Sequence, residues 1–269
     1  MRSVPFLPAL RAQGLQVTGF IFLSAAILIG ACVGSFLNVV IHRLPRGESI
    51  VSPRSRCPGC GREIRAWENI PVVSYILLRG KCAGCGGAIS WRYPAVELLT
   101  AAGFGIIFLL DGPGIPLLRD LLFFSLLVPI AFIDIDHRII PDELSLGGLA
   151  AGLLLSFLPG GDWKGSFTGA LLGGGILYAT AFLYEKVRGV EGMGGGDIKL
   201  LAMIGAFVGW RGTLATIFFG ALLGAVGGML SMRKGGEGLK TAIPFGPYLC
   251  AAALGARFLG GEFWGWILI

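Results

Sequence analysis

The chain has 269 residues, of which 54% are hydrophobic and only 14% are charged, and its mean hydropathy is +0.77. Soluble domains usually carry about 25% charged residues, so this balance excludes an ordinary soluble protein and predicts a multi-pass membrane protein. The net charge of +6 does not indicate nucleic-acid binding, because the basic residues are spread over loops without an aromatic-rich basic groove.

Hydrophobic segments follow one another along nearly the whole chain, and each approaches the roughly 20 residues that span a hydrocarbon core. We expect about eight spans, at about 17–41, 95–110, 117–134, 143–158, 165–184, 198–210, 212–231 and 243–260. The 45 glycines agree with this interpretation, since small residues let membrane helices pack closely. The expected fold is an all-α polytopic bundle whose main solvent is the lipid bilayer.

The first hydrophobic segment is also the place where a cleaved signal would lie. Ile29-Gly-Ala-Cys32 weakly resembles a lipoprotein processing site. Cleavage there would leave an apolar segment from Val33 instead of a polar tether, so we interpret the segment as a retained span.

Residues 42–93 form the one long polar connection between spans, whereas the other connections are short, as between antiparallel neighbouring helices. We therefore divide the chain into an N-terminal segment with the first span (1–41), a small insertion (42–93) and a membrane domain (94–269). Fifteen of the 22 lysines and arginines fall on the side of this insertion and six on the opposite side. The positive-inside rule then places the insertion in the cytoplasm.

Four cysteines in the insertion form two CxxC pairs, Cys57-Pro-Gly-Cys60 and Cys82-Ala-Gly-Cys85. This spacing lets two thiolates of each pair face one ion, and four cysteines fill a tetrahedral Zn²⁺ site and leave no position for water. The prediction is a structural zinc ion that folds a small polar insertion. Two disulfides or a redox motif are the alternative, but stable disulfides are uncommon in a reducing cytoplasm. Cys32 and Cys250 have no partner at metal spacing and receive no role.

The third span ends in Asp134-Ile-Asp136-His-Arg-Ile-Ile-Pro141, and a new helix is expected to start at the proline. Residues two apart point to different helical faces, so only one of the two aspartates should face inward. Asp142 and Glu143 then act as charges at a helix start.

A second acidic position, Asp197, follows Gly194-Gly-Gly and opens a sixth hydrophobic segment of only about thirteen residues. Such a helix rises roughly 20 Å, less than the hydrocarbon core, which indicates irregular backbone lining a cavity. An acidic residue there is costly unless it is protonated, paired or wetted, so it is a functional candidate.

Two carboxylates brought together retain one proton, and this suits hydrolysis of a peptide bond. The ionised member draws a proton from water while the protonated member donates to the carbonyl oxygen. The residues alone leave alternatives open: ion pairs with Arg138 or Lys199, a carboxylate-dependent proton-coupled transporter, or a membrane scaffold whose zinc knuckle binds a partner.

Several motifs, in this order over roughly residues 31–250, together resemble the bacterial type IV prepilin peptidases, which are GxGD-type intramembrane aspartyl proteases. They are Gly34-Ser-Phe-Leu-Asn-Val-Val-Ile-His-Arg-Leu-Pro45, the two CxxC pairs, Trp91-Arg-Tyr-Pro-Ala-Val-Glu97, Asp134 to Pro141, Gly194-Gly-Gly-Asp197 and Ile243-Pro-Phe-Gly-Pro247. The family pattern places its catalytic aspartates at Asp134 and Asp197, with Asp136 as the rival for the first position.

The resemblance implies a bacterial inner-membrane enzyme that removes a basic leader from type IV prepilins and type II secretion pseudopilins. Cleavage would follow a glycine at the cytoplasmic face. It also implies N-methylation of the new N-terminal residue with S-adenosylmethionine, since family members that methylate usually carry a long loop such as 42–93. We assign no residue to that cofactor.

Overall fold

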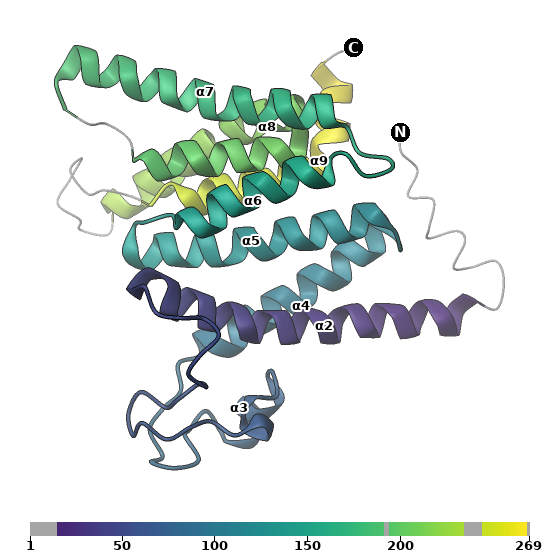
Figure 1. Cartoon of the computed structure of the whole chain (residues 1–269), viewed down its shortest axis with the longest axis vertical. Coiled ribbons are helices and arrows are strands. Elements are labelled where there is room, and N and C mark those ends of the chain that lie inside the picture. The colour runs from purple at the N-terminus through teal and green to yellow at the C-terminus, as the bar shows by residue number, and fades with distance from the viewer. Residues whose placement is uncertain (1–14, 191–193, 234–243, 268–269) are drawn as a thin grey trace. The chain divides into compact units, whose positions relative to one another are not determined.

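A computed structural model describes residues 15–190, 194–233 and 244–267. These residues form eight α-helices, labelled α2 to α9, and no strands (Figure 1). The chain divides into two compact units, with the boundary inside a helix between Pro129 and Ile130. Each unit is described separately below.

The first unit is built on two long helices, α2 (Leu15–Arg43) and α4 (Arg92–Asp111). They approach closely at two glycines of α2: a Cβ added at Gly34 would lie 2.8 Å from the Cα of Glu97, and one added at Gly30 would meet Phe104 at the same distance. Small residues thus set the helix separation, as expected for packing in a membrane. Asn38 donates to the backbone carbonyl of Tyr93 at 3.0 Å and joins the same helices.

The insertion between α2 and α4 contains only short elements. These are the 3₁₀ turns η1 (Leu44–Arg46) and η2 (Ala66–Asn69), the one-turn helix α3 (Val73–Leu77), and two isolated bridges that pair Arg56 with Glu63 and Lys81 with Ala88. A segment with so little regular structure has few means of holding itself together, and this agrees with the predicted need for a metal.

Helix α5 (Ile115–His137) contains the boundary between the units and an internal proline, Pro129. The second unit continues with α6 (Asp142–Leu155), α7 (Trp163–Arg188), α8 (Gly195–Arg233) and α9 (Gly246–Ile267). Helix α6 begins directly after Pro141, as predicted.

Helix α8 is broken at Gly209, whose φ of +71° and ψ of 176° are not helical. Gly205 and Thr213, four residues on either side of this break, both reach Gly169 of α7: the Thr213 hydroxyl lies 3.5 Å from the Gly169 carbonyl oxygen, and a Cβ at Gly205 would overlap the same carbonyl. Both arms of α8 therefore pack on one helix, which agrees with the predicted separate spans 198–210 and 212–231.

Five helices of the described part are long and apolar enough to cross a membrane. They are 19–46, 92–111, 115–137, 163–188 and 195–230, the last counting both arms of α8 as one. Helix α6 has only 14 residues and rises about 21 Å, which leaves it shorter than the hydrocarbon core. The prediction of an all-α polytopic membrane protein with a small cysteine-bearing insertion is confirmed.

Candidate active site and metal site

Asp134 lies in the last turn of α5 and is only 5% exposed to solvent. Asp136, two positions later, is exposed. Residues two apart on a helix point to nearly opposite sides, so burying one exposes the other. The structure thus selects Asp134 as the inward carboxylate and confirms that the two aspartates occupy different faces.

The carboxylate of Asp134 is held by the first residue of α9. The Gly246 backbone N–H donates to Asp134 Oδ2 at 2.9 Å, and this hydrogen bond is buried. The first N–H groups of a helix have no partner within the helix, so one of them is available here for a carboxylate. A Cβ at position 246 would lie 2.7 Å from the same oxygen, so any larger residue would displace the carboxylate from this position. Ile243, the first residue of the predicted Ile-Pro-Phe-Gly-Pro motif, lies outside the described residues.

Asp197 lies in the first turn of α8 and is half-buried. Asp197 lies within electrostatic range of Asp134, although the two residues stand 63 positions apart in the sequence. The neighbouring Gly196 packs on Ile140, where an added Cβ would be 3.1 Å from the isoleucine Cβ. Gly192 and Met193 of the glycine-rich motif lie outside the described residues.

Lys199 forms its ion pair with neither of these aspartates. Its Nζ lies 2.7 and 2.8 Å from the two carboxylate oxygens of Asp142. The pair connects the start of α8, two residues beyond Asp197, to the start of α6. The sequence did not predict this pairing, because Asp142 was interpreted as an ordinary charge at a helix start.

Cys250 is a neighbour of this site that the sequence did not reveal. It is buried in α9 and lies within electrostatic range of both Asp134 and Asp197. A lone cysteine in a hydrophobic segment carries no signal of such a position, because buried free cysteines commonly behave as small apolar residues.

The four cysteines of the insertion converge. The sulfur atoms of Cys57, Cys60, Cys82 and Cys85 all lie within 4.8 Å of one another, and Cys57 Sγ and Cys85 Sγ are 3.9 Å apart. A tetrahedral site with Zn–S bonds of about 2.3 Å requires sulfur atoms about 3.8 Å apart. The donor set and its spacing therefore fit a four-coordinate thiophilic ion, with every position filled by protein.

The two cysteine pairs adopt the same turn. The N–H of Cys57 donates to the carbonyl oxygen of Arg62, and the N–H of Cys82 donates to that of Gly87. Each turn closes on a glycine with positive φ, Gly61 at +70° or Gly86 at +69°, a conformation that glycine adopts without strain. Backbone N–H groups of Cys85 and Gly84 lower the pKa of Cys82 to about 6, which favours the thiolate that a metal requires.

An ion pair supports the cluster from one side. Arg62 lies against the second turn, where a Cβ at Gly84 would be 2.8 Å from Arg62 Nε, and it pairs with the buried Glu68 at 2.8 Å. The Arg65 backbone N–H and the Arg62 guanidinium lower the pKa of Glu68 and keep it charged. The Arg62 guanidinium also interacts with the Cys82 sulfur, so its positive charge would favour a thiolate at that position.

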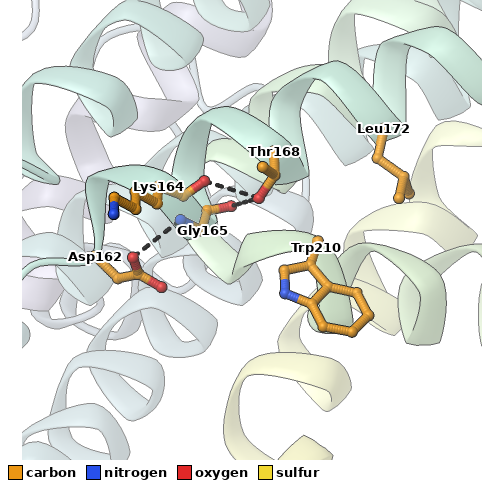
Figure 2. Close-up of a pocket in the computed structure, with 6 residues that line it drawn as sticks. All are labelled: Asp162, Lys164, Gly165, Thr168, Leu172 and Trp210. Carbon is orange, nitrogen blue, oxygen red and sulfur yellow. Dashed lines mark hydrogen bonds between the residues drawn. The ribbon is translucent and has the colours of Figure 1, made fainter.

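A separate hollow of about 520 Å³ lies at the start of α7 and holds none of the predicted site residues (Figure 2). It is lined by Asp162, Lys164, Gly165, Thr168, Leu172 and Trp210. Two of its polar side chains are engaged by the helix itself: Asp162 caps the start of α7 by accepting from the Gly165 N–H at 2.9 Å, and the Thr168 hydroxyl donates to the Lys164 carbonyl oxygen. Trp210 follows Asp197 by thirteen residues, about 20 Å of helix, so the hollow is remote from the carboxylates.

Comparisons with known proteins identify relatives over most of the chain. Residues 28–110 match the bacterial peptidase A24 N-terminal domain, and residues 121–229 match the type IV leader peptidase family. The chain belongs to the type IV leader peptidase family. The first match contains the four cysteines and the second contains both aspartates, so the two sites lie in separately recognised parts.

Three relatives carry the name prepilin leader peptidase/N-methyltransferase. The protein from Stutzerimonas stutzeri is 40% identical over 90% of this chain and 92% of its own length, and that from Pseudomonas aeruginosa is 40% identical over 90% and 91%. The protein from Myxococcus xanthus is 44% identical over 81% of this chain, a match that spans 66% of the relative. No solved structure matches. The prediction of a prepilin peptidase with N-methyltransferase activity is confirmed at the level of enzyme class, and nothing favours a transporter.

Proposed function

We propose that Asp134 and Asp197 are the catalytic pair with which this enzyme cleaves the leader from type IV prepilins and type II secretion pseudopilins. The observation that carries the proposal is the buried Asp134 carboxylate, held by the Gly246 N–H and within electrostatic range of Asp197. Two carboxylates in one site are the minimum that an aspartic protease needs.

In the proposed reaction, water lies between the two carboxylates and the scissile peptide. The ionised carboxylate accepts a proton from water while the water oxygen bonds to the carbonyl carbon. The protonated carboxyl group donates its proton to the carbonyl oxygen. Collapse of the tetrahedral intermediate then breaks the C–N bond: the proton held by the first carboxylate passes to the leaving nitrogen, and one hydroxyl proton of the intermediate returns to the second carboxylate. The Gly246 N–H fixes the position of one carboxylate, so the geometry exists before substrate arrives.

The proposed substrate reaches this site along the membrane. Asp134 ends one hydrophobic helix and Asp197 begins another, so a peptide bond at the junction of a basic leader and a hydrophobic segment would lie at the same level. The positive-inside rule supports the cytoplasmic face of a bacterial inner membrane for this junction. Residues 94–269 then constitute the protease domain.

We further propose that the cysteine cluster of the insertion 42–93 holds structural Zn²⁺ through Cys57, Cys60, Cys82 and Cys85. All four positions are protein thiolates, so the ion would stabilise the fold and take no part in hydrolysis. N-methylation of the new N-terminus with S-adenosylmethionine is proposed from the relatives' name, and no residue is assigned to that cofactor.

The test is cleavage of a membrane-embedded prepilin by the purified enzyme and its variants, followed by mass spectrometry of the product. Asp134→Asn and Asp197→Asn should each lower the rate at least about 10³-fold, because a general acid or base is lost. Asp136→Asn is the matched control and should retain activity. A methyl mass increment that requires S-adenosylmethionine would support the second activity. Full activity in either of the first two variants would sink the assignment.

A further inference from the structure

A short segment of the insertion turns its apolar face outward. Four side chains of residues 70–77 are largely exposed: Ile70 at 46%, Val73 at 48%, Ile76 at 66% and Leu77 at 74%. Val73 and Leu77 share one face of α3 and Ile76 borders it, while Ile70 stands in extended backbone just before the helix. A segment dissolved in water would turn this face toward its own core, so the outward direction requires an explanation.

The polar side chains of the same segment are directed at the insertion's own backbone. The Ser74 hydroxyl donates to the Ile70 carbonyl oxygen at 2.7 Å, and the Tyr75 hydroxyl lies 3.5 Å from the Ile89 carbonyl oxygen. Hydroxyl groups paired with backbone carbonyls beside exposed apolar side chains are expected in a lipid environment, where polar groups must find partners within the protein.

A buried carboxylate fixes the depth of this segment. The Val72 N–H, immediately before α3, donates to Glu97 Oε2 at 2.7 Å, and Glu97 also accepts a hydrogen bond from Ser35. Glu97 lies five residues inside the start of α4, which is about 7 Å along the helix, and Ser35 lies eight residues before the end of α2, about 12 Å. The start of α3 is therefore held alongside the two spans and not beyond their ends.

The attachment is specific, because it holds an unfavourable backbone conformation. Val72 has a φ of +61°, which is rare for a β-branched residue and costs on the order of 1–3 kcal/mol unless the surroundings enforce it. The hydrogen bond to Glu97 is made by the N–H of this same residue. The carboxylate of α4 thus stabilises the unusual backbone conformation at the residue before α3.

We propose that residues 70–77 form an interfacial loop whose outer face, Ile70, Val73, Ile76 and Leu77, is buried in the lipid bilayer at the boundary between headgroups and acyl chains. Exposed Trp67 and Trp91 flank the loop in the chain, as aromatic residues do at membrane interfaces. The exposed cations Arg65, Arg79 and Lys81 are available to lipid phosphates. The insertion is then anchored to the membrane by its own side chains, in addition to the helices at its ends.

The test uses a photoreactive residue in the full-length enzyme reconstituted in vesicles of phosphatidylethanolamine and phosphatidylglycerol. Ile76→benzoylphenylalanine is irradiated, and phospholipid adducts are counted by mass spectrometry. Leu28→benzoylphenylalanine, at an exposed position of α2, gives the yield for lipid contact. Val51→benzoylphenylalanine is the matched negative control: Val51 is exposed and apolar, but its loop is held at the end of α2 by the Arg43 hydrogen bond to Ser49.

Lipid adducts at position 76 should approach those at 28 and exceed those at 51 about fivefold or more. Glu97→Ala should lower the yield at 76, whereas Glu97→Gln, whose side-chain carbonyl still accepts the Val72 N–H, should preserve it. A yield at 76 no greater than at 51 overturns the proposal, as do adducts at 76 that join mainly to protein. If Glu97→Ala does not fold, the comparison of positions 76, 28 and 51 decides alone.

Discussion

Gly246 performs two tasks with one backbone position. Its N–H donates to Asp134, and its lack of a side chain leaves room for the carboxylate, since a Cβ would come within 2.7 Å of Oδ2. A carboxylate displaced by even a fraction of an ångström loses its alignment with water and with the second aspartate. The effect on catalysis should therefore be larger than the effect on folding.

We expect Gly246→Ala to lower kcat for prepilin cleavage about 10–100-fold with little change in the melting temperature. Gly255→Ala, in the same helix, is the matched control because no atom lies within 4 Å of the added Cβ. The measurement is steady-state cleavage beside thermal unfolding of the purified enzymes. Equal losses in the two variants, or an unchanged rate in the first, would contradict a positioning role for Gly246.

Single residues were predictable where a local rule applied. The face rule separates Asp134 from Asp136, and the CxxC spacing identifies all four sulfur donors without any knowledge of the fold. Gly246 and Cys250 were not predictable as neighbours of Asp134, because their contacts join segments more than a hundred residues apart. Sequence spacing has no bearing on which helices meet across a bundle.

Among the helices, the Asp142–Lys199 pair connects the starts of α6 and α8. Both side chains are substantially exposed, at 56% and 39%, so the pair adds at most about 1 kcal/mol to stability. Lys199 is nevertheless only two residues from Asp197. We therefore expect the pair to affect the position of the proposed catalytic carboxylate more than the stability of the fold.

Lys199→Met should lower kcat about 5–20-fold, and the charge exchange Asp142→Lys with Lys199→Asp should recover part of the loss. Lys186→Met, which removes an exposed lysine from α7, should have no effect. Cleavage rates of Asp142→Lys alone, Lys199→Asp alone and the exchanged variant give the coupling between the two residues. Purely additive losses would show that the ion pair does not position α8.

If the cysteine cluster holds zinc as proposed, the insertion is the element whose stability should depend most on a ligand. We expect Cys60→Ser to lose about one zinc ion per chain, since three thiolates bind the metal far more weakly than four. The apo insertion should then be cut by protease within 42–93 while the membrane helices remain intact. Metal content by mass spectrometry and limited proteolysis provide the readout, with Cys32→Ser, outside the cluster, as control. Wild-type zinc content in the first variant would refute the site.

At the same scale, hydrophobic runs located the helices well because a membrane span must be long and apolar. The break at Gly209 was also predictable from the interruption between two runs. The position of α3 beside the spans was not predictable, because it depends on one hydrogen bond from the Val72 N–H to Glu97. In the sequence, Glu97 resembled an ordinary charge at the start of a helix.

For the whole molecule, the sequence gives an orientation that no contact within the protein can give. Lipid, translocation and membrane potential determine which side of a membrane protein faces the cytoplasm. In the sequence, this orientation is indicated by the distribution of lysine and arginine among the loops. With the insertion inside, the end of α5 and the start of α8 are also inside. The two aspartates and the cysteine cluster should then share the cytoplasmic face, which is where a leader that never crosses the membrane must be cut.

Three exposed lysines make this orientation measurable: Lys81 in the insertion, Lys186 near the end of α7 and Lys164 near its start. A membrane-impermeant amine reagent applied to intact spheroplasts should modify Lys164 and spare Lys81 and Lys186, and inverted vesicles should give the reverse pattern. Detergent-solubilised enzyme, in which all three should react, controls for intrinsic reactivity. Modification of Lys81 and Lys164 from the same side would break the alternation of spans between them and remove the basis for a cytoplasmic active site.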